Sequence, residues 1–344
     1  MTPLSPKPAP RQRATMKDVA REAGVGIKTV SRVVNGEGYV GEATAARVRA
    51  AVERLAYRRD VSAGSLRRAD RRTLSIGLLL GDVSNPFDAQ VHRGVEDAAG
   101  AAGFAVLSAS LDEDPERERE LVPTMGSYQV DGLIVMPAGP DPTALQREMD
   151  AGMPIVLVDR GVEGLETDSV VVDNESGARL ATEHLISYGH RHIAFMGDRQ
   201  FLPTAHMRLE GYKQACWAAR AATHVVQDLS NEYLAETATR AMLQSSPAPT
   251  AIFAAQNLIT IGVVRALRSL GLEHEIAVVG FDDITLGDLV SPAISVIAQD
   301  PHLIGKVAAE RLLARIGGDT GPVQQIVVPT SFLVRGSGEI PPPA

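Results

Sequence analysis

Small apolar residues between positions 15 and 35 repeat at the spacing of α-helices. Two short stretches each place three of them on one helical face: Val19, Ala20 and Ala23, then Val30, Val33 and Val34. Gly24 lies between the stretches and is suited to a tight turn. Two short helices joined by a glycine turn predict a helix-turn-helix, and a helical hairpin that only packs is the open alternative.

In a helix-turn-helix the first residues of the second helix meet base edges in the major groove. Here these residues are Ile27 and Lys28, with Arg32 one turn further along the same face. After a glycine-rich loop, residues 42–57 repeat three apolar positions at helical spacing: Val48, Val52 and Leu55. This repeat predicts a third helix that closes an all-α head over the first two.

From residue 73 onward the pattern changes, because apolar runs alternate with amphipathic helical segments such as 87–102. Ten runs are typical of buried strands: 74–80, 104–110, 132–137, 154–159, 169–173, 192–197, 225–228, 251–255, 276–282 and 296–299. Strands that alternate with helices predict parallel sheets with right-handed crossovers. Since ten strands are too many for one such core, we expect two α/β lobes.

Composition agrees with several large cores, because 44% of the 344 residues are apolar and 22% are charged. Residues 1–14 are proline-rich and basic without an apolar segment, so we expect a disordered lead and no secretory signal. No apolar run is long enough to span a bilayer, so no membrane partner is expected. Cys216 is the single cysteine, which excludes an intramolecular disulfide and fits a reducing compartment.

Charge is distributed unevenly along the chain, although the net charge is −8. Residues 1–72 contain 16 basic and 7 acidic residues, an excess of +9, whereas the remainder contains 18 basic and 35 acidic residues. The basic end can neutralise phosphates, and the acidic body would be repelled by them. A basic segment that coincides with a helix-turn-helix indicates a nucleic-acid-binding head.

The sequence offers little for catalysis. It contains no P-loop, no HExxH and no GxSxG motif. Cys216 lies in a helical run beside Trp217, where we expect a packed core residue. His190 and His192 are spaced like a metal pair, but no third ligand is nearby, so we expect a structural or interface role. We therefore expect no enzyme, no cofactor and no metal.

Two stretches of the head resemble the LacI/GalR family of bacterial transcription regulators: TMKDVAREAGVGIKTVSRVVN and ARVRAAVERLAY. The resemblance implies a DNA-binding head at residues 15–57. The family usually has Ser where Gly26 and Gly41 stand, so the two helices that follow are expected to start with slightly weaker caps. Further candidates for DNA contact in this head are Thr15, Lys17, Thr29, Ser31 and Asn35.

The resemblance places the family's hinge helix at residues 58–72. It aligns Leu66 with the leucine that two subunits push into the minor groove, which kinks the duplex. The basic residues around it would hold phosphates: Arg58, Arg59, Arg67 and Arg68. The family's usual proline is missing at Arg59, and Gly64 weakens a helix by up to about 1 kcal/mol relative to Ala. We expect a hinge that becomes helical on DNA, with an ordinary basic linker as the alternative.

The body, from Ile76 to about Arg335, resembles the periplasmic-binding-protein-like core of the same family. The matching motifs occur in order: SNPF, VDGLIVMP, IVLVDR, VVVDN, GHRHIAFMGD, RLEGY, IGVVRALRSLG and VVGFDD. This resemblance implies a core at 73–344 with two parallel-sheet, Rossmann-like lobes, between which the chain crosses three times. The first lobe is expected at about 73–171 and 300–326, and the second at about 172–299 and 327–340.

Polar residues at the carboxyl ends of parallel strands point into the crevice of such sheets. Strand ends are followed by Asp82, Asn85 and Phe87, by Asp159 and Arg160, and by Asp282. The family's effector-contacting positions are occupied by Asp159, Arg208, Gln256, Asp282 and Gln299. Carboxylates, amides, an arginine fork and an aromatic platform at Phe87 suit a sugar or polyol. For Asp282, an internal brace is the open alternative.

One departure from the family affects this pocket. Where the family commonly has Asn-Asp, the chain has Gln256 and Asn257, which removes a carboxylate and lengthens an amide. The pocket is therefore not a copy of a known sugar repressor. Arg160 and Arg208 together would equally suit a carboxylate or a phosphate on the ligand.

Together these features predict a homodimeric, cytoplasmic and nucleoid-associated transcription factor, usually a repressor in this family. It would bind a pseudo-palindromic double-stranded operator under allosteric control by a small-molecule effector, expected to be a carbohydrate. The tail has no leucine heptads, so a dimer is expected in place of a tetramer. The alternatives are a two-lobed small-molecule-binding protein without a DNA-dependent role and a sugar-processing enzyme. The former has no use for a basic head, and no acid-base pair can be named for the latter.

Overall fold

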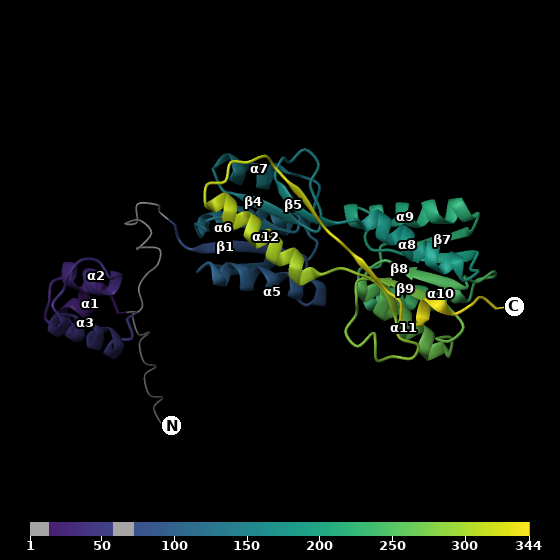
Figure 1. Ribbon diagram of the computed structural model, residues 1–344, viewed down its shortest axis with the longest axis horizontal. Coiled ribbons are helices and arrows are strands. Elements are labelled where there is room, and N and C mark those ends of the chain that lie inside the picture. The colour runs from purple at the N-terminus through teal and green to yellow at the C-terminus, as the bar shows by residue number, and fades with distance from the viewer. Residues whose placement is uncertain (1–13, 58–71, 344) are drawn as a thin grey trace, which may run out of the picture. The chain divides into compact units, whose positions relative to one another are not determined.

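The computed structural model describes residues 14–57 and 72–343, and the chain divides into two compact units between Thr73 and Leu74 (Figure 1). Residues 1–13 of the expected lead and residues 58–71 of the expected hinge, Leu66 included, therefore lie outside the described residues. Within the described parts of the chain, no helix is both long and apolar enough to cross a membrane.

The small unit contains three helices: α1 (Met16–Ala23), α2 (Ile27–Asn35) and α3 (Glu42–Arg54). A capping box starts α1, because the Thr15 side chain accepts from the Asp18 N–H and the Asp18 carboxylate accepts from the Thr15 N–H at 2.9 Å. Gly24 ends α1 in the left-handed conformation, at φ 64°, and turns the chain into α2. The predicted helix-turn-helix head is confirmed.

The core of the head is small and made of valines and alanines. Val19, Val30 and Val48, one from each helix, are fully buried against one another. The caps expected to be weak are indeed incomplete, since neither Gly26 nor Gly41 provides a side-chain hydrogen bond to the helix it precedes. The starts of α2 and α3 consequently depend on packing.

The first lobe of the large unit is a parallel sheet with the order β11-β5-β4-β3-β1-β2. Its strands are β1 (Ser75–Leu80), β2 (Ala105–Ser110), β3 (Leu133–Val135), β4 (Ile155–Val158), β5 (Asp168–Val172) and β11 (Gln325–Val328). Helices α5 (Pro86–Ala101) and α12 (Pro301–Ile316) cover one face. Helices α6 (Pro115–Ser127) and α7 (Thr143–Asp150) cover the other. The sheet therefore has a separate apolar core on each side.

Two glycines allow α5 and α12 to pack backbone to backbone. A Cβ atom on Gly94 would lie 2.1 Å from the carbonyl oxygen of His302, and one on Gly305 would lie 2.0 Å from that of Val91. Any larger side chain at either position would force the helices apart. This contact fixes α12, which enters the lobe late in the chain, against α5 beside the cleft described below.

The second lobe is a sheet with the order β12-β10-β9-β8-β6-β7. Its strands are β6 (His192–Met196), β7 (Ala222–Val226), β8 (Ala251–Ala254), β9 (Ala277–Phe281), β10 (Ser295–Ala298) and β12 (Ser331–Leu333). Helices α8 (Asn174–Ser187) and α9 (Pro203–Ala219) lie on one face. Helices α10 (Glu232–Leu243) and α11 (Asn257–Leu270) lie on the other, and a 3₁₀ turn, η1 (Ser337–Glu339), follows β12.

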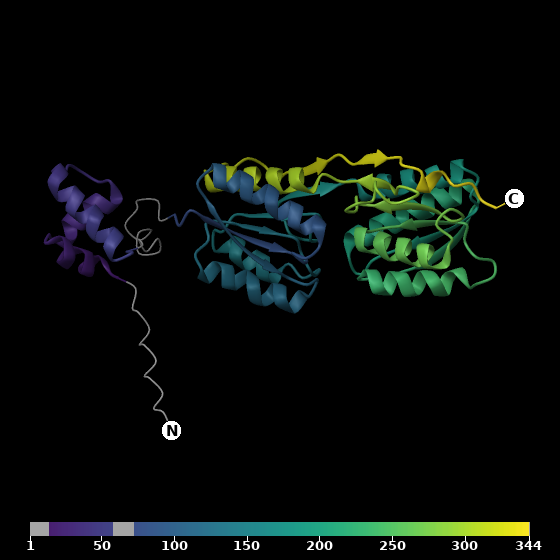
Figure 2. The ribbon, with the colours of Figure 1, turned by 90° about the horizontal axis from the view of Figure 1, so that it is seen from below.

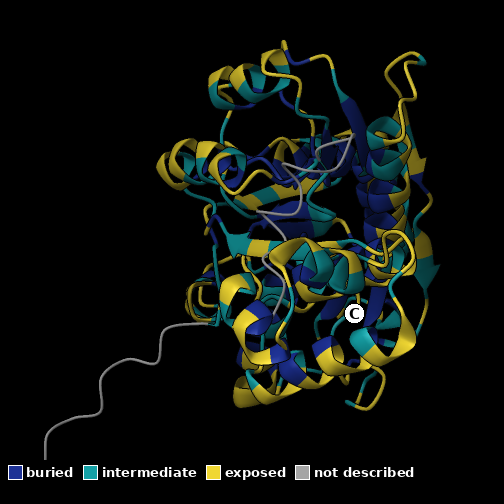
Figure 3. Ribbon diagram, turned by 90° about the vertical axis from the view of Figure 1, so that its left-hand side faces the viewer, coloured by how far each residue is buried: buried dark blue, intermediate teal, exposed yellow. Residues whose placement is uncertain are grey.

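The chain passes between the two sheets three times (Figure 2). It crosses after β5, after β10 and between β11 and β12. In both lobes the buried residues are concentrated in the strands and on the inward faces of the helices (Figure 3). The predicted α/β core with two lobes is confirmed, and β11 continues two residues past the expected limit of the first lobe at 326.

Three strands differ from the prediction. β7 spans residues 222–226, whereas the apolar run predicted 225–228, and β11 and β12 were not predicted. The predicted parallel sheets are confirmed, with one antiparallel edge pair that was not predicted, because β12 pairs antiparallel with β10. All three are edge strands with solvent-exposed positions, so they lack the continuous apolar run that marks a buried central strand.

The missing cap at α3 leads to a stability prediction. A Cβ atom on Gly41 meets nothing within 4 Å, and its φ of −55° suits any residue. Gly41→Ser adds a cap acceptor and restricts the unfolded chain, so it should stabilise the head by about 0.5 kcal/mol. Hydrogen exchange at the α3 amides of the full chain measures this change.

The matched control is Gly38→Ser in the same loop. Gly38 has φ 68°, where a side chain is strained, so this substitution should destabilise the head. Equal effects of the two substitutions would show that the cap at α3 does not limit the stability of the head.

Candidate functional site

The start of α2 presents the predicted base-contacting side chains to solvent. Ile27 is 43% exposed, and Lys28 and Arg32 are also exposed. Positions 28 and 32 share one helical face because they lie about one turn apart. An isoleucine that remains in solvent at the first helical position contributes little to the core of the head, so it is available for contact with a partner.

The other candidates in the head also make contacts within it. Thr15 donates its hydroxyl to Asp18 at 2.6 Å as part of the capping box, whereas Lys17 is exposed. Asn35 donates its amide to the hydroxyl of Ser31 at 3.1 Å, and both residues are half-buried, as is Thr29. The hinge candidates lie outside the described residues: Arg58, Arg59, Leu66 and Arg67.

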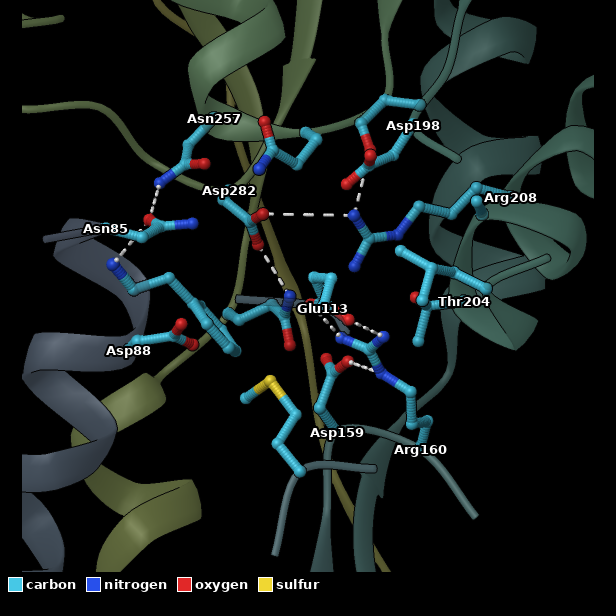
Figure 4. A pocket seen from close by; sticks show the side chains of 17 residues that line it. Asn85, Asp88, Glu113, Asp159, Arg160, Asp198, Thr204, Arg208, Asn257 and Asp282 are labelled. Atoms are coloured by element: carbon cyan, nitrogen blue, oxygen red, sulfur yellow. Dashed lines mark hydrogen bonds and ion pairs between the residues drawn. The ribbon is translucent and has the colours of Figure 1, made fainter. Parts of the chain in front are cut away.

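A polar cavity of about 500 Å³ opens between the two lobes of the large unit (Figure 4). Residues of both lobes line it: Asn85, Phe87, Asp88, Glu113, Met136, Asp159, Arg160, Asp198, Leu202, Thr204, Ala205, Arg208, Ala255, Gln256, Asn257, Asp282 and Gln299. Eight of the nine sequence-predicted effector residues belong to this set. The cavity lies at the carboxyl ends of the strands, where parallel sheets bind ligands.

Asp159 and Asp282 occupy equivalent places in the two lobes. Asp159 follows β4 and Asp282 follows β9, and both have left-handed backbone conformations, with φ of 67° and 70°. Non-glycine residues seldom adopt this conformation, and they do so most often where the surrounding structure requires it. In both lobes the strand therefore ends in a turn that carries a buried carboxylate at the cavity.

Arg160 is enclosed by carboxylates. Its Nη1 and Nη2 atoms donate to the two oxygens of Glu113 at 2.9 and 3.0 Å, and its Nε atom donates to Asp159 at 2.9 Å. Burial alone would lower the pKa of Arg160, but the charges of Asp159 and Glu113 raise it above the ordinary value. The guanidinium is thus permanently charged and held in one orientation.

Asp88 is a buried carboxyl group next to this ion pair. It accepts the N–H of Asp82 at 2.6 Å. Burial raises the pKa of Asp88 to about 7, and the nearby charges of Asp159 and Glu113 add to this shift. Since its carboxyl group is partly protonated near neutral pH, Asp88 can donate as well as accept a hydrogen bond.

Arg208 reaches the cavity from α9 and is supported on several sides. It donates to the side chain of Asn174 and to the carbonyl of Ala255, both at 2.8 Å. The guanidinium lies 3.8 Å from the ring centre of Phe281, and its Nη1 atom lies 3.8 Å from Asp282. These polar contacts involve the Nε and Nη1 atoms of the guanidinium.

Asp282 makes internal contacts and also lines the cavity. It accepts from Gln299 at 2.5 Å and faces Arg208, so it braces the second lobe, and it also lines the cavity. Burial raises the pKa of Asp282, while Arg208 and Gln299 act in the opposite direction. The Oε1 atom of Gln299 is buried without a partner among the described residues.

Gln256 and Asn257 make different contacts within the core. The side-chain carbonyl of Gln256 caps α11, accepting from Leu258 at 2.7 Å and Ile259 at 3.1 Å. Asn257 instead donates to the side chain of Asn85 at 2.6 Å, which directly links the second lobe to the first. The substitution noted in the sequence therefore provides a helix cap and a bond between the lobes.

Asp82 does not line the cavity, in contrast to the prediction. It is exposed, and its carboxylate accepts from the N–H of Ser84 at 2.8 Å, which closes a turn before α5. The prediction missed the acidic residues Asp88, Glu113 and Asp198. Glu113 and Asp198 lie just after β2 and β6, so the strand-end rule that found Asp159 would also have found these two.

His190 and Cys216 have structural surroundings. His190 is buried, with one ring nitrogen 2.9 Å from the Thr250 hydroxyl and the other 2.8 Å from the carbonyl of Ile340. Cys216 is fully buried in the second lobe, as predicted, and burial raises its pKa to about 11. In the regions that the structure covers, no group of three or more potential ligands could hold a metal.

Two family models match the chain. The model of bacterial regulatory proteins of the lacI family matches residues 15–60, and the model of the periplasmic binding protein-like domain matches residues 182–338. The chain is 35% identical to the HTH-type transcriptional regulator PtxS of Pseudomonas aeruginosa, over 95% of this chain and 96% of the relative. It is 32% identical to the ribose operon repressor of Halalkalibacterium halodurans, over 93% and 96%.

The chain also resembles solved structures of transcriptional regulators. A lac repressor dimer bound to operator and the anti-inducer ONPF has a TM-score of 0.81 and 26% identity, over 95% of this chain and 99% of that one. A complex of the transcriptional regulator CelR with cellobiose has a TM-score of 0.69 and 31% identity, over 94% and 100%. On the head motif, the two-lobed core and relatives aligned over nearly their full length, the chain belongs to the LacI family of bacterial regulatory proteins.

Proposed function

We propose that the chain is a dimeric repressor that binds a pseudo-palindromic operator and is controlled by a sugar-like effector bound between the lobes of its core. As a member of the LacI family it is a DNA-binding transcriptional regulator and not an enzyme. Because its partner is operator DNA, it would act in the cytoplasm at the nucleoid. No feature of the described head residues favours the alternative, a small-molecule-binding protein without a DNA-dependent role.

The proposal of an effector site rests on one observation: residues of both lobes line the cavity. Asn85, the N-cap of α5, and Asn257 on α11 are bonded across it at 2.6 Å. A ligand that enters between them contacts both lobes, so its binding energy depends on how the lobes are arranged. The occupied and empty states should therefore favour different arrangements of the first lobe in the dimer, which would move the two hinges and change DNA affinity.

The lining of the cavity suits a polyol. Carboxylates and amides can accept and donate to several hydroxyl groups, and Phe87 offers an apolar face to ring C–H groups. Two relatives give independent support, since one is named a ribose operon repressor and another was solved with cellobiose. The effector residues proposed on this basis are Asn85, Phe87, Asp159, Arg160, Arg208, Gln256, Asp282 and Gln299.

The proposal of operator binding rests on the helix-turn-helix head. Ile27, Lys28 and Arg32 are exposed on α2, and the first 72 residues carry an excess of +9. Both heads of a two-fold symmetric dimer would then read matching half-sites in adjacent major grooves. We further propose that residues 58–72 form the hinge, in which Leu66 would wedge into the minor groove.

A gel shift with the DNA upstream of the protein's own gene tests the function directly. A specific complex that weakens steeply with salt is expected, because phosphate contacts release counterions. A thermal-shift screen of sugars, polyols, sugar acids and purines would then identify the effector, since a ligand of the folded state raises the melting temperature. Failure to form any specific complex would contradict the proposal.

Lys28→Ala should reduce operator affinity by about 1–3 kcal/mol and relax the base preference at one position of each half-site, because a base-edge contact is lost. Fluorescence anisotropy with the operator and its single-base variants measures both effects. Arg49→Ala is the matched control, since it removes the same charge from α3, where Arg49 is paired with Glu42. An equal loss in the two variants, without any change of base preference, would exclude Lys28 from base readout.

Leu66→Ala should weaken operator binding and leave effector binding intact, because the wedge is lost while the core is unchanged. Operator titration and effector calorimetry on the same sample separate the two properties. Unchanged operator affinity would show that the segment is an ordinary basic linker.

Asp282→Asn should weaken effector binding by roughly 1.5–3 kcal/mol, the usual contribution of a hydrogen bond to a charged group, while operator binding without effector persists. The control is Asp283→Asn, because the neighbouring carboxylate is held by Arg335 at 2.6 and 2.7 Å. Calorimetry and operator anisotropy should show a loss of response in the first variant alone. A full response from Asp282→Asn would make Asp282 a brace and no ligand contact.

A further inference from the structure

The effector cleft contains two buried guanidinium groups, and one of them is already fully paired. All three nitrogens of Arg160 hold carboxylate oxygens, two from Glu113 and one from Asp159, at 2.9 to 3.0 Å (Figure 4). The side chains of Arg160 and Glu113 are 6% and 16% exposed. A bidentate fork in this arrangement has little capacity left for an incoming anion.

The backbone holds Glu113 in this position. Asp112 and Glu113 both have left-handed conformations, with φ of 55° and 54°, which is uncommon for two consecutive residues other than glycine. The Asp112 N–H donates to the carbonyl of Gly81 at 2.7 Å. A Cβ atom on Gly81 would lie 2.9 Å from Glu113 Oε1 and 3.1 Å from Asp88 Oδ2, so the glycine leaves room for both carboxyl groups.

Negative groups outnumber positive ones around the cavity. The lining includes two guanidinium groups and four carboxylates, Glu113, Asp159, Asp198 and Asp282, besides the carboxyl group of Asp88, which is partly protonated near neutral pH. The second guanidinium, that of Arg208, is partly neutralised by Asp282 at 3.8 Å. A carboxylate or phosphate on a ligand would meet like charge in a site that is shielded from water, which is strongly unfavourable.

We infer that Glu113 determines the charge specificity of the cleft, because it occupies Arg160 and so makes the site select uncharged or amine-bearing polyols over sugar acids and sugar phosphates. This inference rests on the proposed function of the cleft as the effector site. Hydroxyl groups donate to the carboxylates and to the buried Oε1 atom of Gln299, which has no partner among the described residues. An ammonium group gains additional attraction from the acidic lining.

The test uses the full chain and matched ligand series. Glucose, galactose, mannose and ribose are each compared with the corresponding amino sugar, sugar acid and terminal phosphate by calorimetry. Within any series that binds, the neutral or amino form should bind at least about tenfold more tightly than the acid and the phosphate.

Glu113→Gln then tests the residue itself. The variant keeps the shape of the side chain but releases the charge of Arg160, so the affinity for the acid relative to the neutral sugar should rise about tenfold or more. Glu116→Gln is the control, since Glu116 is exposed at the start of α6 and pairs with Arg119 at 2.5 Å. The control should leave the ratio unchanged. Thermal melting establishes that each variant is folded, and Glu113→Asp, which keeps the charge, should retain the wild-type ranking.

Three results would overturn the inference: tightest wild-type binding by an acid or phosphate, no binding by any neutral or amino sugar, or an unchanged ratio in folded Glu113→Gln. If Glu113→Gln does not fold, the wild-type ranking and Glu113→Asp decide the matter. Failure of the proposed function is distinguishable, because it would appear as loss of the specific operator complex in the same samples without sugar.

Discussion

The hydrogen bond between Asn257 and Asn85 joins two lobes that are otherwise built as separate bodies. Each lobe has its own sheet and its own apolar cores, so neither requires the other to bury its strands. The surfaces that face each other across the cleft are instead polar, with buried carboxylates at the ends of β4 and β9. Polar contacts are exchanged for ligand or water at lower cost than apolar packing, which allows the arrangement of the lobes to depend on what occupies the cleft.

Much of the fold could be predicted from the sequence, because it is encoded in local patterns. The valines of the head repeat at helical spacing, and the central strands of both lobes are continuous apolar runs. Three edge strands were not predicted correctly, because they lack such a local pattern. Strands β7, β11 and β12 expose part of their surface, so no uninterrupted apolar run marks them, and the antiparallel pairing of β12 depends on a long-range return of the chain.

The sequence predicted most of the residues that line the site, but it did not predict which of them bond to one another. The strand-end rule and the family resemblance placed eight of nine candidates at the cavity, whereas Asp82 closes a turn outside it. The sequence left Arg160 free to hold an anionic ligand. Its actual partner, Glu113, is 47 residues away, and contacts over such a distance depend on how strands are ordered in the sheet. The same is true of Asn257, whose partner lies in the other lobe.

The central claim is that the effector acts by changing the arrangement of the lobes. Its most direct test places cysteines at positions 85 and 257, joins them with a short thiol-specific crosslinker, and measures operator affinity before and after the reaction. Cys216 is buried and should not react. The crosslinked protein should bind operator with altered affinity that no longer responds to effector. Operator affinity and effector response that are both unchanged by crosslinking would contradict this mechanism.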